Sequence, residues 1–323
     1  MKLIFCITAF ATCCTAIPAT AADAPGYPSK PIRIVVPFPP GGIADVMSRV
    51  FGQKFTDSWS QPVVIENRTG AGGNIGADII AKSPPDGYSL VMGTIGTHAV
   101  NVSLFSKLPY DPVRDFVPVA LVVEADGLLV LHPSVPAKTV KELISLARSR
   151  PGQLVYASPG NGTAGHLSGE LFKSLAKIDL VHIPYKGNVP ALTDLVGGQT
   201  SMLFATMPTA MPLARAGKLY AMAVTGAQRN PAAPELPALA ETLPGFEVTN
   251  WIGIFAPSST PADIVTKLNH EIMRIMRLPE VQARLVTEGA KSRANTPAEF
   301  GAFQKMEIAK WSKLIKEARI SVD

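Results

Sequence analysis

Short runs of hydrophobic residues alternate along the chain with Gly- and Pro-rich turns and with segments of helical spacing. The first run, at 32–36, is followed by the turn 37–42 and by apolar residues at 46, 47, 50 and 51. Strands predicted at 62–66 and 88–92 are followed by Gly-rich loops at 67–76 and 93–98, and a helix is predicted over 77–82. This alternation predicts an α/β fold with a parallel sheet, whose ligands bind beyond the carboxyl ends of the strands.

The second half of the chain repeats the pattern between two long apolar segments. Strands are predicted at 154–158 and 180–183, and each is followed by a Gly-rich loop and a helix, ending near 176 and 195. Shorter elements are expected near 202–204 and 219–224. Two apolar runs at 116–123 and 127–131, separated by residues 124–126, are interpreted as a crossing from the first group of elements to the second, and the segment 248–255 as the return crossing.

Several helix starts carry capping signals. Residues 139–142 have the form of a capping box. Thr260 and Thr296 each precede a proline suited to the first helical position, so both are predicted N-caps. The last helix is predicted to reach about Arg319. Its apolar stripe, at positions 300, 303, 306, 308, 311, 314 and 315, should pack against the first group of elements.

Residues 1–22 have the three-part form of a secretory signal peptide. Lys2 precedes an apolar core at 3–16, and small residues at 19–22 suit cleavage. We therefore expect an exported protein whose mature chain begins near residue 22 or 23. The three cysteines, Cys6, Cys13 and Cys14, lie in this segment, which predicts a mature chain without disulfides. A lipid anchor at Cys13 is the alternative, but the preceding Phe-Ala-Thr is a poor signal for it.

Composition narrows the possible functions. Of 30 Lys and Arg residues only Lys2 lies in the signal peptide, so 29 remain against 25 Asp and Glu, a net charge of +4. This excess slightly favours an anionic small molecule. No basic run with interleaved aromatic residues occurs, so no nucleic acid partner is expected. No later segment approaches the roughly 18 apolar residues of a membrane span. The remaining length predicts two lobes rather than one small core.

The turn at 37–45 has features of an anion site. Its prolines hold the loop extended, and Gly41 and Gly42 let the backbone approach a ligand, with Gly42 expected to use a positive φ. The first amides of the following helix have no partner within the helix, and the helix dipole favours a negative charge there. The alternative is an ordinary connection between a strand and a helix.

Other motifs fit known chemistry poorly. Residues 160–165 match G-x-G-x-x-G, but the next strand ends in His182-Ile183 without the acidic residue that a dinucleotide site needs. No common hydrolase, zinc-protease or P-loop motif occurs. His98 and His166 each lie in a Gly-rich loop, where either could contact a ligand or fix the loop. Lys186 could bind a ligand or be a solvated surface lysine.

Segments throughout the mature chain resemble the substrate-binding proteins of the tripartite tricarboxylate transporter family, often called Bug receptors. Together the matches are highly specific for the family, though not for any member. They lie at 27–33, 37–45, 66–76, 84–88, 93–101, 108–112, 115–116, 156–167, 184–195 and 251–257.

The resemblance implies a type II periplasmic-binding-protein fold, in which two α/β lobes are joined by two crossing strands around a ligand cleft. Lobe 1 would comprise residues 23–124 and 249–323, and lobe 2 residues 125–248. The implied function is a periplasmic receptor, monomeric and without cofactor or metal, that captures a small organic carboxylate and delivers it to a membrane permease. The alternative is a secreted hydrolase that uses Ser158 with His166 in the same cleft.

The resemblance also implies the ligand contacts. Ser201 stands where many relatives have an acidic residue. This argues against a ligand, such as an amino acid, whose ammonium group needs an acidic partner in the protein. We expect the opening loop to anchor the carboxylate, with Asp45 orienting that loop. The full implied set is Phe38, Pro39, Gly41, Gly42, Ile43, Ala44, Asp45, Ala71, Gly72, Thr94, Gly96, Thr97, His98, Ser158, Gly160, Gly162, Thr163, His166, Tyr185, Lys186, Gly187 and Ser201.

Overall fold

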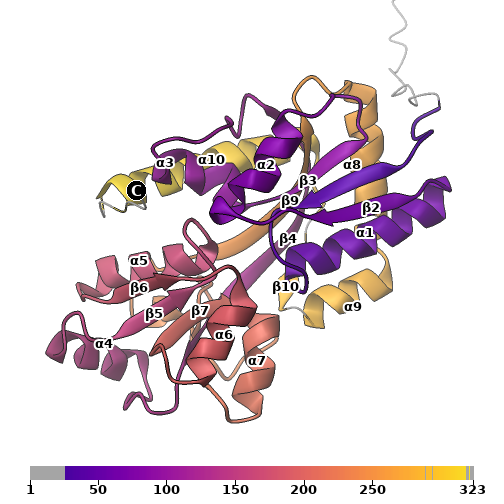
Figure 1. The fold of residues 1–323 in the computed structure, drawn as a ribbon. Coiled ribbons are helices and arrows are strands. Elements are labelled where there is room, and N and C mark those ends of the chain that lie inside the picture. The colour runs from indigo at the N-terminus through magenta and orange to yellow at the C-terminus, as the bar shows by residue number, and fades with distance from the viewer. Residues whose placement is uncertain (1–25, 288, 293, 318–319, 321–323) are drawn as a thin grey trace, which may run out of the picture.

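The protein was analysed as a computed structural model that describes residues 26–287, 289–292, 294–317 and 320. The predicted signal peptide at 1–22, with its cysteines, lies outside these residues. So does the predicted end of the last helix near Arg319. The described chain forms two lobes, with the first above the second in the view of Figure 1.

The first lobe is built on three parallel strands in the order β2-β1-β3, which confirms the predicted parallel sheet. Antiparallel β9 and β4 extend it. Helices α1 and α8 pack on one face, and α2 and α10 cover the other (Figure 1). Its elements are β1 (Ile32–Val36), α1 (Ile43–Trp59), β2 (Val63–Asn67), η1 (Ala71–Gly73), α2 (Asn74–Ala81), β3 (Ser89–Thr94), η2 (Gly96–Val100), α3 (Asn101–Leu104), β9 (Thr249–Pro257), α8 (Ala262–Met276), α9 (Pro279–Thr287), β10 (Ala290–Lys291) and α10 (Pro297–Glu317).

The second lobe carries another parallel set, in which β5 lies between β7 and β6. Its sheet is completed by the end of β4 and by β8. Helices α5, α6 and α7 each begin just after one of the parallel strands. Its elements are α4 (Val140–Ser149), β5 (Val155–Ser158), α5 (Ala164–Ala176), β6 (Val181–Pro184), α6 (Asn188–Val196), β7 (Met202–Thr206), α7 (Met207–Arg215), β8 (Tyr220–Val224) and η3 (Leu239–Glu241).

One long strand, β4 (Phe116–Leu131), belongs to both lobes. It pairs with β9 from Phe116 to Asp126 and with β7 from Gly127 to Leu131, so its partner changes between Asp126 and Gly127. The two apolar runs predicted for this segment are thus one continuous strand, which crosses between lobes as expected. Strand β9 lies beside it, and its first residue, Thr249, pairs with Asp126.

A buried carboxylate fastens α10 to the sheet of the first lobe. Glu307, 6% exposed, accepts hydrogen bonds at Oε2 from Nε1 of Trp251 on β9, at 3.0 Å, and from Nε1 of Trp311, at 2.9 Å. Both indoles are 1% exposed, so neither can use water as a substitute acceptor. The predicted apolar stripe of this helix is buried at Phe300, Trp311 and Ile315, but Met306 is 58% exposed. That part of the prediction was wrong.

Other local predictions failed for identifiable reasons. The expected loop at 93–98 is instead the end of β3 followed by a π-helical turn, η2, in which the Thr97 hydroxyl accepts from the Thr94 amide at 2.9 Å. Helix α7 was not predicted, because Pro208 and Pro212 lie within it. Thr260 is not an N-cap, since its hydroxyl donates to the Pro257 carbonyl and Pro261 occupies the cap.

Other predicted features agree. Thr296 accepts from the Glu299 amide at 3.2 Å, as an N-cap should. Thr139 accepts likewise from the Glu142 amide, although the Glu142 carboxylate accepts from Lys138 rather than from the cap itself.

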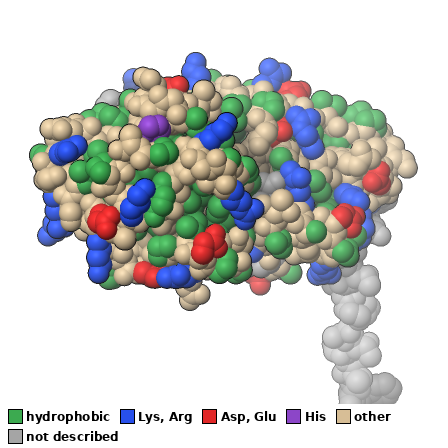
Figure 2. Space-filling view, turned by 90° about the horizontal axis from the view of Figure 1, so that it is seen from below, with side chains coloured by type: hydrophobic (Ala, Val, Ile, Leu, Met, Phe, Trp, Pro, Cys, Tyr) green, Lys and Arg blue, Asp and Glu red, His purple; other side chains and the backbone are tan. Residues whose placement is uncertain are grey.

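On the face seen from below, basic and acidic side chains are interspersed among apolar ones without a continuous charged patch (Figure 2).

We expect Glu307→Leu to lower the free energy of unfolding by about 3 kcal/mol. Two buried indole N–H groups would lose their acceptor, and each unsatisfied buried donor costs about 1–3 kcal/mol. Glu317→Leu, at an exposed position of the same helix, should change stability by less than about 0.5 kcal/mol. Urea denaturation followed by tryptophan fluorescence measures both, and equal losses would contradict the assigned role of Glu307.

Candidate functional site

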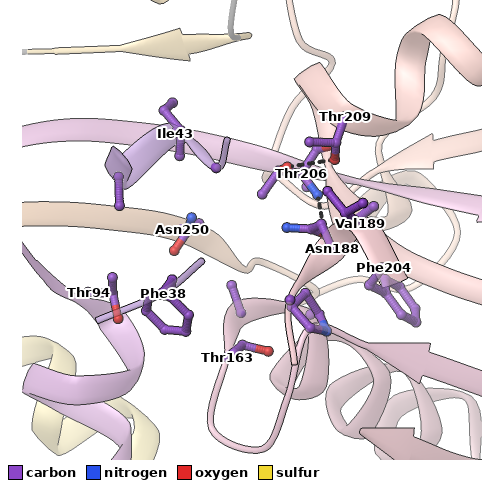
Figure 3. Close-up of a pocket in the computed structure, with 18 of the residues that line it drawn as sticks. Phe38, Ile43, Thr94, Thr163, Asn188, Val189, Phe204, Thr206, Thr209 and Asn250 are labelled. Atoms are coloured by element: carbon purple, nitrogen blue, oxygen red, sulfur yellow. Dashed lines mark hydrogen bonds between the residues drawn. The ribbon is translucent and has the colours of Figure 1, made fainter. Parts of the chain in front are cut away.

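A cavity of about 350 Å³ lies between the lobes, where the carboxyl ends of the parallel strands meet (Figure 3). This volume suits a small molecule. Strands β1 and β3 end at it from the first lobe, and β5, β6 and β7 end at it from the second. The two crossing strands form the remaining wall, with Asp126 and Gly127 from β4 and Asn250 and Ile252 from β9.

The wall of the first lobe is the opening loop, residues 38–44, with Thr94 and Ile95 beside it. The amides of Gly42, Ile43 and Ala44 have no hydrogen-bond partner in the part of the chain that the structure describes. They lie at the start of α1, where the helix dipole adds partial positive charge. The loop carries no basic residue, so backbone groups alone make it attractive to an anion.

Asp45 holds this loop from behind. Its carboxylate accepts from the Gly41 amide at 3.1 Å, from Arg49 Nη2 at 2.9 Å and from Asn67 Nδ2 at 3.0 Å. Burial opposes the charged form, but these hydrogen bonds outweigh it and hold the pKa of Asp45 below its ordinary value. Asp45 does not line the cavity. The geometry agrees with an orienting role for Asp45 and differs from the implied ligand contact.

The positive φ of the loop lies at the other of its two glycines. Gly41 has the positive φ, +93°, whereas Gly42 is extended at φ −81°. The expectation of a positive φ at Gly42 was therefore wrong. A Cβ at Gly42 would meet nothing within 4 Å, so a side chain there would project into open space beside the free amides. The Gly41 amide is already used by Asp45.

The wall of the second lobe is formed by the starts of three helices. Thr163 caps α5, where its hydroxyl accepts from His166 and donates to the Gly160 carbonyl at 2.7 Å. Asn188 opens α6, and Thr206 precedes α7. Each helix start directs peptide dipoles toward the cavity, so the field there also favours negative charge. Lys186 adds an exposed ammonium at the rim, and Val189, Pro190 and Phe204 give the wall apolar surface.

The structure brings only part of the implied contact set to the cavity. The implied residues that line it are Phe38, Pro39, Gly41, Gly42, Ile43, Ala44, Thr94, Thr163, Lys186 and Gly187. Those that do not are Asp45, Ala71, Gly72, Gly96, Thr97, His98, Ser158, Gly160, Gly162, His166, Tyr185 and Ser201.

His98 is a structural residue. Its ring is fully buried and stacks on Phe255 with centroids 3.9 Å apart, and Nδ1 lies 2.8 Å from the Thr97 hydroxyl. Burial lowers the pKa of His98 to about 3, so the ring is neutral at physiological pH. Of the two roles considered for this histidine, the geometry matches the fixing of a loop.

Ser158 pairs with a different histidine from the one expected. Its hydroxyl lies 2.7 Å from Nε2 of His182 and accepts from the Gly160 amide, while His166 Nδ1 accepts from Gly162. His166 and His182 stack with centroids 4.4 Å apart. Burial above all lowers their pKa values, to about 4 and about 3. Ser158 is fully buried and does not reach the cavity, so the expected pair with His166 is wrong and the group fixes the loop before α5.

Two further implied contacts point elsewhere. The Tyr185 hydroxyl donates to Asp194 of α6 at 2.7 Å. Ser201 precedes β7 at the end of that strand opposite the cavity, where its hydroxyl accepts from the Val155 amide. Because a parallel strand presents only its carboxyl end to the ligand side, a residue before β7 cannot line the site.

Several of the remaining residues form a glycine-lined seam where the lobes touch. A Cβ at Gly96 would lie 2.7 Å from the Gly162 carbonyl oxygen, and one at Gly72 would lie 2.6 Å from that of Asn161. A Cβ at Gly162 would in turn clash with Oδ1 of Asn101 in the first lobe. These glycines therefore allow the two backbones to meet, and no larger side chain fits between them.

Sequence reasoning missed much of the second wall. Asn188 and Val189 directly follow the implied 185–187 segment and could have been included on that ground. The lining residues near β7 were missed because helix α7 was not predicted. Those on β9 were missed because the sequence did not indicate which face of that strand points toward the cavity. The missed lining residues include Asn188, Val189, Phe204, Thr206, Thr209, Thr225 and Asn250.

Among the described residues no cluster of three or more His, Cys, Asp and Glu side chains could hold a metal ion. No helix formed by these residues has the length and apolarity that membrane crossing requires.

Comparisons with known proteins point to one family. The profile described as "Tripartite tricarboxylate transporter family receptor" matches residues 47–320. Protein BugT of Bordetella pertussis is 36% identical, with 93% of this chain and 92% of BugT covered. R. palustris Rpa4515, solved with adipate, is 37% identical with a TM-score of 0.88, covering 92% of this chain and all of that one. The periplasmic binding protein BugD is 33% identical with a TM-score of 0.85, at the same coverage.

We expect Gly96→Ala to prevent full contact of the lobes without straining the backbone, because φ at Gly96 lies outside the left-handed range. In small-angle scattering the wild-type radius of gyration should fall at saturation with a carboxylate that the protein binds, and that of Gly96→Ala should fall less. Gly197→Ala, at an exposed glycine of ordinary φ in the second lobe, is the control. An equal decrease in all three proteins would show that the seam does not close on the ligand.

Proposed function

The chain belongs to the tripartite tricarboxylate transporter receptor family, and on this premise we propose that it delivers a captured carboxylate to a membrane permease. The fold is that of a two-lobed periplasmic binding protein. Family and neighbours are solute-binding receptors, which favours binding over catalysis. We further propose that the protein is exported by a cleaved signal peptide and acts as a monomer.

The observation that carries the proposal is the set of unpartnered amides at the start of α1. Hydrogen bonds to a charged acceptor contribute about 1.5–3 kcal/mol each, and the amides of Gly42, Ile43 and Ala44 face the cavity with no competing partner among the described residues. Asp45 keeps the loop in place without presenting its charge to the cavity. We propose that a ligand carboxylate binds here and that Lys186 contributes less, because its side chain is exposed at the rim.

The motion that accompanies binding follows from the connections between lobes. We propose that residues 23–124 and 249–323 move as one body and residues 125–248 as the other, about the segment where β4 changes partner. Only the closed arrangement lets both walls touch one ligand, so a ligand shifts the equilibrium toward it.

A hydrolytic role for the same cleft has little support. Ser158 and His182 form a hydrogen-bonded pair, but the serine is fully buried and lies outside the cavity lining. A nucleophile must reach its substrate, and this hydroxyl does not.

We expect Gly42→Val to fold normally and to bind adipate at least about 100-fold more weakly. The added side chain would project into open space in front of the free amides, and losing two such hydrogen bonds costs about 3 kcal/mol. Lys186→Ala should weaken binding about tenfold, or about 1.4 kcal/mol.

The measurement is a thermal-shift screen across linear mono- and dicarboxylates, followed by calorimetry on those that stabilise the protein. A ligand at about 100 times its dissociation constant stabilises by about 2.7 kcal/mol, which is a readable shift. Gly197→Val is the control for added bulk. If Gly42→Val keeps the wild-type shift while Lys186→Ala removes it, the anchor is the lysine and not the loop.

A further inference from the structure

Asn188 lies in the wall of the second lobe, and a carboxylate bound at the opening loop gives this residue no role. It is half-buried, is the first residue of α6 and lines the cavity. Its Oδ1 accepts from the Thr206 amide at 3.3 Å, a bond drawn in Figure 3. Since a backbone N–H can only donate, this bond fixes the oxygen toward Thr206 and leaves the NH₂ group on the cavity side. Nδ2 has no partner among the described residues.

The other polar side chains of this wall are occupied within the protein. Thr206 and Thr209 bond each other at 2.9 Å, and Thr209 also donates to the Thr206 carbonyl. Thr163 donates to the Gly160 carbonyl, and Ser168 to that of Ala164. Among the described side chains of this wall, the NH₂ of Asn188 and the exposed ammonium of Lys186 are therefore the donors left for a ligand. The backbone amides of Ala164 and Gly165 at the start of α5 lie beside them and likewise have no partner among the described residues.

Groups near Asn188 favour an acceptor on the ligand. The starts of α5, α6 and α7 all face this side of the cavity, so their dipoles stabilise negative charge and oppose positive charge. The side chain of Asn250, on β9 between the lobes, has no hydrogen-bond partner among the described residues to orient its amide, and it can serve as donor or acceptor. Of the two side-chain amides that line the cavity in the described part of the chain, Asn188 is the one held with its donors toward the cavity.

We propose that Asn188 determines specificity by donating from Nδ2 to an oxygen of a second acidic group, at the ligand end opposite the carboxylate on the opening loop. This assignment rests on the proposed function, because it takes the first carboxylate to be bound at Gly42–Ala44. It makes the receptor select dicarboxylates over monocarboxylates of equal length, and over ligands whose far end is an ammonium group.

The test is Asn188→Asp, which keeps an oxygen for the Thr206 amide and replaces the NH₂ group by a second oxygen. Calorimetry on the mature chain would use adipate, hexanoate and 6-aminohexanoate. Wild type should bind adipate at least about 30-fold more tightly than hexanoate. The variant should bind adipate about 100-fold more weakly than wild type, keep hexanoate within about threefold, and gain affinity for 6-aminohexanoate relative to adipate.

Gln199→Glu is the matched control, because it makes the same change of charge on an exposed residue of this lobe, before β7 and away from the cavity. It should leave all three affinities unchanged. Unaltered adipate binding by Asn188→Asp, or an equal loss for adipate and hexanoate, would overturn the assignment while the proposed function stands. If wild type binds no member of a panel of linear mono- and dicarboxylates, the proposed function fails and the assignment fails with it.

Discussion

The site depends on backbone amides that have no partner within the described part of the fold. A helix cannot satisfy its own first N–H groups, and most proteins cover them with a side chain or with water. At the start of α1 no side chain caps them, because the Ncap residue is Gly42 and Asp45 is engaged with Gly41 behind the loop. The contacts of Asp45 with Arg49 and Asn67 then keep the amides aimed at the cavity before any ligand arrives. Such preorganisation reduces the entropy lost on binding.

The two walls of the cavity differ in the side chains that they add to free helix-start amides. Among the described residues, amides without a partner lie at the start of α1 in the first lobe and at Ala164 and Gly165 of α5 in the second. Hydroxyl groups of the second wall bond within the protein, whereas Asn188 keeps its NH₂ group free. Glycines at the seam let the lobes approach so closely that the walls can act on one small ligand. The hydrogen-bonded and stacked group of Ser158, His166 and His182 stabilises the loop on the second side of that seam, as Thr97 and His98 stabilise the first.

The sequence predicted the parts of the fold that depend on local pattern. Alternating apolar runs and Gly-rich turns were enough to find the parallel strands, and Pro and Gly residues marked the opening loop. Contacts made through sheet register were not accessible. Ser158 meets His182 rather than His166 because β5 and β6 pair in parallel, with Tyr156 opposite His182. The expected ligand contact at Ser201 is not found in the cavity wall for a related reason, because the direction of β7 decides which end of the strand faces the cavity. Helix α7 was missed because its prolines contradict local helix propensity.

The order of strands has a consequence for how the chain folds as it is made. Strand β9 lies between β3 and β4 in the first lobe, yet it is contributed by Thr249–Pro257, after the whole second lobe. The N-terminal strands therefore cannot complete their sheet until most of the polypeptide has been synthesised, whereas residues 127–248 hold all the strands of their own lobe. The inserted lobe can thus fold first and serve as a nucleus that brings β4 and β9 together. Local contacts within one segment form faster than pairings between distant ones, which favours the same order.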